Sequence, residues 1–277
     1  MMPNEINPQS LESVCAALCY AIGIEPPAHA AAPAPELVEY IDSAFGGKKA
    51  DRIVMYNPDA VAHWLYEKYP HLFAEVVSHA DVQLPLHCMM PSVTPVNFGT
   101  MYTGAAPAVH GIQKYAKPVI KIDTFFDALL RAGKKPVILA VPTCSMGMIF
   151  REREMDYVLC KTWDEVNAKA AKILVEDKYD VVIIYNGNYD SRMHKTGPES
   201  IESLGELRHN VHAFAMFSEM IKEMWGHHNT FVGFAMDHGC HEIDGGAGAH
   251  GLDMSEDLNI LHMYKAYPAK IEESKEM

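Results

Sequence analysis

Apolar positions recur along the chain with two different periods, and these periods predict its helices and strands. Short runs rich in β-branched residues are apolar on both faces, as in the buried strands of a parallel sheet: residues 52–56, 136–141, 180–185 and 230–235. Elsewhere apolar residues return every three or four positions, which predicts helices at residues 11–22, around 37–41, and near 59–68, 123–132, 162–175 and 200–225. This order predicts an α/β fold with helices on both faces of a mostly parallel sheet.

The same pattern bears on domain organisation. The Pro/Ala-rich stretch 26–35 is too short to separate domains, so residues 1–50 are expected to form a helical segment packed on the rest. A length of 277 residues is within the reach of one large α/β domain, and we predict a single domain over 1–277. Thr162 and Glu165 match a capping box at the start of a helix.

Charge and composition exclude several classes of partner. The 23 basic and 36 acidic residues give a formal net charge of −13, which opposes binding to nucleic-acid polymers or anionic membranes. No apolar run approaches the ~20 residues that cross a bilayer. The first residues lack the pattern of a secretory signal, so we predict a cytoplasmic protein whose six cysteines are reduced thiols. The oligomeric state stays open.

Aspartates and histidines follow the carboxyl ends of the predicted strands, where open α/β sheets bind ligands. They are Asp59 after the first strand, Asp190 and His194 after the third, and Asp237, His238 and His250 after the fourth. Three carboxylates brought together would repel one another without cations. Because oxygen and imidazole donors in this mixture suit zinc, or manganese in a more open site, we predict two divalent ions.

A polar loop at residues 90–104 runs into a short predicted helix. On composition alone, Thr94 at the start of such a helix is better explained as a simple cap. Next to a metal ion, however, its hydroxyl would become a competent nucleophile.

The stretch from Pro91 to Ile112 resembles the nucleophile segment of the alkaline phosphatase superfamily, and is most similar to the nucleotide pyrophosphatase/type I phosphodiesterase branch. Further along, 190–198 matches the family motif D-x-x-x-H-x-x-G-P, 237–239 matches D-H-G, and 250–251 matches its final histidine. The likeness spans roughly Arg52 to Tyr264.

This resemblance implies an alkaline-phosphatase-like three-layer sandwich and a role for each matched residue. Thr94 is implied as the nucleophile, and Asn97 as the side chain that holds a phosphoryl oxygen. The implied ligands of one ion are Asp190, His194 and His250, and those of the other are Asp59, Asp237, His238 and the Thr94 oxygen.

Three residues depart from the family pattern without removing a ligand. Ala60 and Met193 stand where glycine is usual, and Phe98 stands where the phosphodiesterase branch often has histidine. The sequence has no sulfatase motif at Thr94, and the threonine and the short chain disfavour a phosphomutase. The resemblance implies a two-metal-dependent phosphoric ester hydrolase, similar to phosphodiesterases and nucleotide pyrophosphatases, that acts on a small phosphorylated substrate. The alternatives are a phosphomonoesterase, a phosphomutase or a non-catalytic metal-dependent binding protein.

The sequence near Thr94 contains no cation, which favours a singly charged diester over a doubly charged monoester. Arg192 and Lys195, on either side of His194, are the nearest alternatives. His110 is expected to be structural. His241 and Glu242 fit either a supporting position at the site or a solvated loop.

Overall fold

The computed structural model describes residues 5–270, and buried β-branched runs form the centre of its main sheet. The eight strands lie in the order β1-β3-β10-β7-β2-β6-β4-β5. Neighbouring strands pair in parallel except β10, which runs antiparallel to both β3 and β7. Their bounds are β1 Gln9–Ser10, β2 Arg52–Pro58, β3 Val82–His87, β4 Pro136–Ala140, β5 Asp156–Leu159, β6 Val181–Asn186, β7 Thr230–Phe234 and β10 Asn259–Tyr267.

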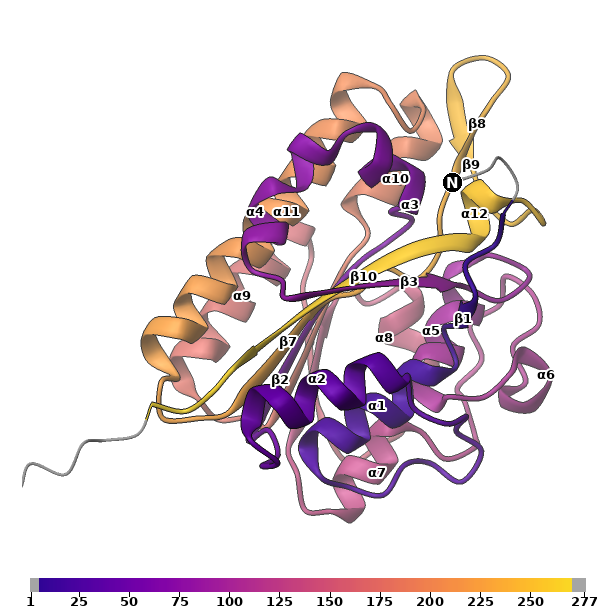
Figure 1. Ribbon diagram of the computed structural model, residues 1–277. Coiled ribbons are helices and arrows are strands. Elements are labelled where there is room, and N and C mark those ends of the chain that lie inside the picture. The colour runs from indigo at the N-terminus through magenta and orange to yellow at the C-terminus, as the bar shows by residue number, and fades with distance from the viewer. Residues whose placement is uncertain (1–4, 271–277) are drawn as a thin grey trace, which may run out of the picture.

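Helices cover both faces of this sheet (Figure 1). On one face lie α3 (His63–Lys68), η1 (Pro70–Phe73), α4 (Ala74–Ser78), α9 (Trp163–Glu176) and α11 (Ile201–Met224). On the other lie α1 (Ser13–Ile22), α2 (Pro35–Phe45), α5 (Thr94–Thr103), α7 (Phe125–Arg131) and α8 (Ser145–Ile149). The predicted three-layer α/β architecture is therefore confirmed, with α1 and α2 of the N-terminal segment packed against α5, β3 and β10.

Short elements complete the chain. They are α6 (Pro107–His110), α10 (Asn188–Thr196), α12 (Ser255–Leu258) and a hairpin of β8 (His241–Ile243) and β9 (Ala247–Ala249). Helix α10 packs against both α11 and β9. Within residues 5–270, no helix combines the length and the apolar character that a membrane span requires.

The four predicted strands are present, but the helix predicted from residue 59 begins only at His63. Asp59 and Ala60 instead form a turn, in which Ala60 has a φ of 62°. Thr162 caps α9 by accepting a hydrogen bond from the Glu165 N–H. The Glu165 carboxylate accepts from the Lys161 N–H, so the predicted capping box is only half formed.

Candidate active site

Strands β7, β2 and β6 are adjacent and parallel, so the segments after their carboxyl ends meet at one edge of the sheet. Asp59 directly follows β2, and Asp237 and His238 follow β7. Asp190 lies in the first turn of α10, after β6, and His194 lies one turn later. Sequence segments far apart thus bring all six predicted metal ligands to one place.

The first ligand cluster consists of Asp59, Asp237 and His238, and all three are buried. The His238 Nε2 lies 3.4 Å from Asp59 Oδ1 and 3.3 Å from Asp237 Oδ2. Thr94 adjoins this cluster as the first residue of α5. Its hydroxyl lies 3.4 Å from each Asp59 carboxylate oxygen and 3.3 Å from His238 Nε2.

The second cluster consists of Asp190, His194 and His250. Asp190 Oδ1 lies 3.2 Å from His194 Nε2 and 3.3 Å from His250 Nε2. The two clusters adjoin, because the ring centroids of His238 and His250 are 4.1 Å apart. The structure therefore groups the six residues as the family resemblance implies.

Backbone carbonyls fix the orientation of all three imidazoles. The Nδ1 atoms of His194, His238 and His250 lie 2.9 Å from the carbonyl oxygens of Gly248, Gly239 and Ser92, respectively. Since a carbonyl only accepts hydrogen bonds, each Nδ1 carries the proton. Each neutral ring then directs the Nε2 lone pair into its cluster, which is how metal-binding histidines are commonly held.

The donor set fits divalent cations. Each cluster contains a buried carboxylate oxygen without a hydrogen-bond partner, Asp190 Oδ1 in one and Asp237 Oδ2 in the other. A buried carboxylate oxygen without a partner raises the free energy of the folded state unless a hydrogen-bond donor or a cation binds it. Together with inward-facing Nε2 atoms, they offer oxygen and nitrogen ligands of the kind that zinc and manganese bind.

Without cations, these groups perturb one another strongly. Burial, with repulsion from Asp190, raises the pKa of Asp237 to about 8, and burial with repulsion from Asp237 raises the pKa of Asp59. Burial alone would also raise the pKa of Asp190, but the imidazoles of His194 and His250 beside its carboxylate outweigh burial and lower that pKa. The Asp190 carboxylate in turn raises the pKa of His194 to about 9.

A pocket of about 170 Å³ opens beside Thr94, Asp59 and Asp190. Residues from distant segments form its walls: Tyr115, Lys117, Val141, Thr143, Cys144, Ser145, Trp163, Tyr185, Gly187 and Ser191. Tyr185 is buried, and its hydroxyl donates a hydrogen bond to Asp59 Oδ2. Sequence reasoning assigned no role to these residues, because they carry no motif and only the fold brings them to Thr94.

The expectation that no cation lies near Thr94 is wrong, because Lys117 lines this pocket. The two alternatives considered from sequence lie elsewhere. Arg192 and Lys195 line a neighbouring hollow of about 260 Å³, where an Arg192 nitrogen lies 3.8 Å from Glu206. Sequence distance failed here because the fold brings Lys117, held by the Thr143 carbonyl, to the same pocket as Thr94.

Asn97 is held by hydrogen bonds to the loop before α5. Its side chain is fully buried, and its Oδ1 accepts a hydrogen bond of 2.7 Å from the Met89 N–H. Its Nδ2 donates to the carbonyls of Met89 and Val93. Asn97 is not among the residues that line the pocket, and its implied role in holding a phosphoryl oxygen stays a prediction.

The three departures from the family pattern have local explanations. Ala60 takes a left-handed conformation with φ 62°, which glycine adopts without strain, and its N–H donates to Asp237 Oδ1. Buried Met193 packs against Gly248, where an added Cβ would lie 2.2 Å from its sulfur. Phe98 is fully buried, with its ring edge-on to Tyr185 at 5.4 Å.

Two further histidines support the surrounding loops. Buried His110 lies 3.1 Å from Thr100 Oγ1 and accepts a hydrogen bond from the Ile112 N–H, which confirms its structural role. His241 Nδ1 lies 2.7 Å from Asp257 Oδ1, and the other Asp257 oxygen accepts from the Leu252 N–H. His241 thus braces the segment that follows His250, whereas Glu242 is exposed.

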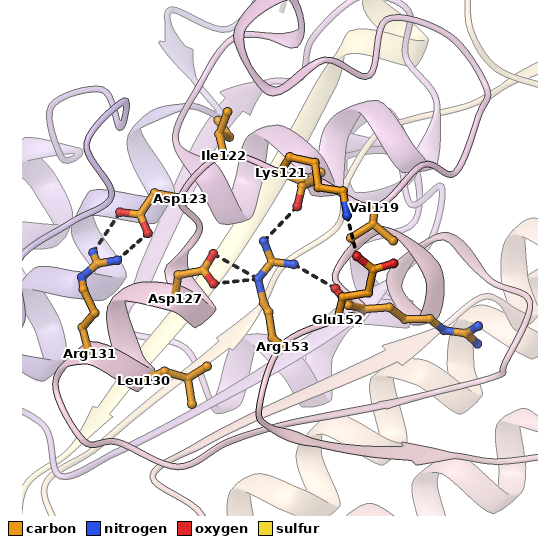
Figure 2. A pocket seen from close by; sticks show the side chains of 11 residues that line it. Val119, Lys121, Ile122, Asp123, Asp127, Leu130, Arg131, Glu152 and Arg153 are labelled. Atoms are coloured by element: carbon orange, nitrogen blue, oxygen red, sulfur yellow. Dashed lines mark hydrogen bonds and ion pairs between the residues drawn. The ribbon is translucent and has the colours of Figure 1, made fainter.

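A larger hollow of about 550 Å³ lies away from both clusters, between α7 and the segments 119–123 and 151–153. Figure 2 shows that six of its charged side chains form ion pairs: Arg131 with Asp123, Arg153 with Asp127, and Lys121 with Glu152. Arg151, which also lines this hollow, donates hydrogen bonds to the carbonyls of Gly147 and Pro142. Most of the charges here are therefore compensated by other residues of the protein, and neither metal-ligand cluster reaches this hollow.

The fold and the paired Asp/His clusters define an alkaline-phosphatase-like protein. The sequence matches the family described as type I phosphodiesterase / nucleotide pyrophosphatase over residues 56–272, and the chain belongs to that family. A search of curated protein sequences found no match.

Similar solved structures agree with this fold. A murine ectonucleotide pyrophosphatase / phosphodiesterase 5 in an inactive form, in complex with AMP, is 16% identical with a TM-score of 0.57, covering 70% of this chain and 59% of that one. The human protein of the same name is 15% identical with a TM-score of 0.54, covering 70% and 58%. Phosphonoacetate hydrolase from Sinorhizobium meliloti 1021, in complex with phosphonoformate, is 17% identical with a TM-score of 0.52, covering 73% and 61%. The chain spans about three fifths of the length of these structures.

Proposed function

We propose that this protein is a two-metal-dependent phosphoric ester hydrolase with Thr94 as its nucleophile. The observation that carries the proposal is the position of Thr94, which lines the pocket with its hydroxyl 3.4 Å from both Asp59 oxygens and 3.3 Å from His238 Nε2. Family membership and the kinds of enzyme among the similar structures support the same reaction class.

The residues of the chain have distinct parts in this reaction. The Thr94 oxygen attacks phosphorus in line with the leaving group, so that one P–O bond forms while the other breaks. Asp59 orients the hydroxyl by accepting its hydrogen bond, and Tyr185 orients Asp59. The departing oxygen leaves as an alcohol, with a proton in place of the one that the Thr94 hydroxyl loses. Water then cleaves the phosphothreonine, which restores Thr94 and releases phosphate from a monoester substrate or a phosphate monoester from a diester substrate.

Divalent ions bound to the two clusters would stabilise the threonine alkoxide and neutralise charge on the phosphoryl oxygens. Asp59, Asp237 and His238, with the Thr94 oxygen, would hold one ion, and Asp190, His194 and His250 the other. The donor set supports zinc or manganese.

The proposed substrate is a small phosphorylated molecule. The similar structures hold AMP or phosphonoformate, and the pocket of about 170 Å³ is well below the roughly 300 Å³ at which drug-sized ligand sites begin. The pocket therefore encloses the phosphoryl group and leaves most of a larger substrate outside.

Replacement of the nucleophile tests this proposal. Thr94→Ala should lower turnover by about 10³-fold or more, as losses of catalytic nucleophiles do, with metal content unchanged. Intact-mass analysis of acid-quenched wild-type enzyme should detect one added phosphoryl group, which the variant lacks. Full activity of Thr94→Ala would contradict the proposal. So would tight binding of two ions without turnover of any phosphate ester, which would indicate a binding protein, or transfer between sugar phosphates without phosphate release, which would indicate a phosphomutase.

A further inference from the structure

We propose that Lys117 is a specificity-determining residue that makes this site prefer phosphate monoesters, with two negative charges, to phosphate diesters, with one. The inference rests on the proposed function and adds its substrate class. It also reverses the preference expected from the residues adjacent to Thr94 in sequence.

The first observation is that Lys117 has no negatively charged partner. Among residues 5–270, it is the only basic side chain that lines the Thr94 pocket. Its ammonium donates one hydrogen bond of 2.8 Å to the Thr143 carbonyl and lies 5.3 Å from the centroid of the Tyr115 ring. No carboxylate of residues 5–270 forms an ion pair with it, unlike Lys121, which pairs with Glu152.

An ammonium group has three N–H donors, and the Thr143 carbonyl uses one. The other two are free for an anion in the pocket. Hydrogen bonds between an ammonium and a phosphate oxygen are charge-assisted and roughly twice as strong as neutral ones. They gain most from a phosphoryl group with two negative charges, which is the feature that separates a monoester from a diester.

The second observation is the difference between the walls of the pocket. Trp163 forms an aromatic wall, edge-on to Tyr185 with ring centroids 5.5 Å apart. Gly187 makes this arrangement possible, since an added Cβ would lie 3.0 Å from the Trp163 ring and 3.0 Å from the Tyr185 hydroxyl. Lys117, Thr143 and Ser145 line the pocket with polar groups instead.

A monoester offers the ammonium and the hydroxyl groups of this pocket three non-bridging oxygens that share two negative charges, whereas a diester offers two such oxygens and one charge. The organic group of either substrate can lie against the aromatic side chains that line the same pocket, Tyr115, Trp163 and Tyr185. The charge of Lys117 therefore favours a monoester.

A matched pair of substrates tests the proposal, namely p-nitrophenyl phosphate and methyl p-nitrophenyl phosphate. They share a leaving group and differ by one charge and one methyl group. In wild-type protein kcat/KM should be higher for the monoester. Lys117→Met should lower monoester kcat/KM by about 10- to 100-fold and change diester kcat/KM by less than about threefold, because only the doubly charged group loses its charge-assisted bonds.

Two variants serve as controls. Lys114→Met removes an exposed cation from the same loop and should leave the ratio of monoester to diester kcat/KM unchanged. Lys117→Arg keeps a cation at position 117 and should retain part of the monoester preference that Lys117→Met loses. A wild-type preference for the diester, or an equal loss on both substrates in Lys117→Met, would overturn the proposal.

A binding measurement separates this proposal from the proposed function. Calorimetric titration of inorganic phosphate into the metal-loaded protein at pH 8 measures phosphate affinity. Lys117→Met should bind phosphate about tenfold more weakly than wild type. If wild type hydrolyses neither ester, the proposed function fails while this binding difference still tests Lys117. Equal phosphate affinity of the two proteins would overturn the Lys117 proposal even if the hydrolase activity is present.

Discussion

The Nε2 atoms of His194 and His250 face each other at 3.1 Å, while the Nδ1 of each ring is bonded to a backbone carbonyl. Two nitrogen lone pairs so close together repel each other unless a proton or a cation lies between them. Asp190 Oδ1 completes the same triangle, at 3.2 Å and 3.3 Å from the two nitrogens. These three atoms can therefore stay this close only when a proton or a cation lies between them.

The reconstituted protein should bind two divalent ions per chain. His250→Ala should lose the ion of its cluster and Asp237→Ala the other, because each removes one ligand of three. Elemental analysis after dialysis measures the stoichiometry, and His209→Ala, an exposed histidine on α11, serves as the control that keeps both ions. Fewer than one ion per chain in the wild type would contradict the two-metal site.

The metal-free protein should become less stable as pH rises from about 5 to 7.5. The folded-state pKa of Asp237 is raised to about 8, chiefly by burial, so in this range the folded state holds a proton that the unfolded state has released. The free energy of unfolding then falls with pH, by at most about 1.4 kcal/mol per pH unit for one proton. The pKa of His194 is also raised, to about 9. Above the ordinary histidine pKa, the folded state therefore holds a second proton that the unfolded state has released, and the free energy of unfolding falls further.

Chemical denaturation in the presence of a chelator measures this slope. Asp237→Asn should reduce it, because the amide does not titrate, whereas Glu176→Gln on the exposed side of α9 should not. Added metal should also reduce the slope by holding the carboxylate ionised. A metal-free protein whose stability rises through this range would refute the assignment.

Removal of the Tyr185 hydroxyl should weaken metal binding at one cluster only. Tyr185 donates to the Asp59 carboxylate, and partners of this kind that orient a ligand are worth about 10- to 100-fold in metal affinity. Competition with a chromophoric chelator should show a weaker first cluster in Tyr185→Phe. The control Tyr157→Phe, which loses a hydrogen bond to the Phe150 carbonyl instead, should bind both ions normally. Equal metal affinities of Tyr185→Phe and Tyr157→Phe would contradict this role of Tyr185.

Gly248→Ala should destabilise the protein and the cluster of His194 together. The added Cβ would lie 2.2 Å from the Met193 sulfur, a clash of the kind that costs about 1–3 kcal/mol, and it would displace the Gly248 carbonyl that holds His194. Met193→Ala in the same chain should restore part of the melting temperature and of the metal affinity.

Gly205→Ala is the matched control for that substitution. Gly205 lies within α11 with nothing near its Cβ position, and alanine there should stabilise the protein by about 0.5–1 kcal/mol. If Gly248→Ala melted like wild type and kept its metal, the close packing of Met193 would not constrain the site.

The sequence predicted the parts of the fold that have a strong period. Helix α9 was expected at 162–175 and spans Trp163–Glu176, and α11 was expected at 200–225 and spans Ile201–Met224. Strands β3 and β10 were missed for physical reasons: Pro85 interrupts the first, and in β10 the polar residues His262 and Lys265 interrupt the apolar run. In the sheet these strands pair with each other, a contact that neither segment indicates alone.

The candidate site also contains residues that the sequence predicted and residues that it did not. The metal-ligand candidates lie in short motifs after strands, so their order along the chain made them recognisable and the structure brings them together. Lys117 and Trp163 belong to no motif and reach the pocket only through loop and helix packing. The family motif predicted a phosphoryl-binding role for Asn97, and the sequence alone did not indicate that this side chain bonds to the backbone of Met89.

The antiparallel strand β10 has a consequence for how the protein folds. It lies between β3, which precedes the helix of Thr94, and β7, which precedes Asp237 and His238. Until residues 259–267 insert, no strand joins the half of the sheet next to the nucleophile to the half that bears the ligands. Such long-range pairing is slow to form, so a growing chain would acquire its helices well before the site. We expect a nascent protein that stops before β10 to be compact in parts but unable to hold Thr94 against Asp59.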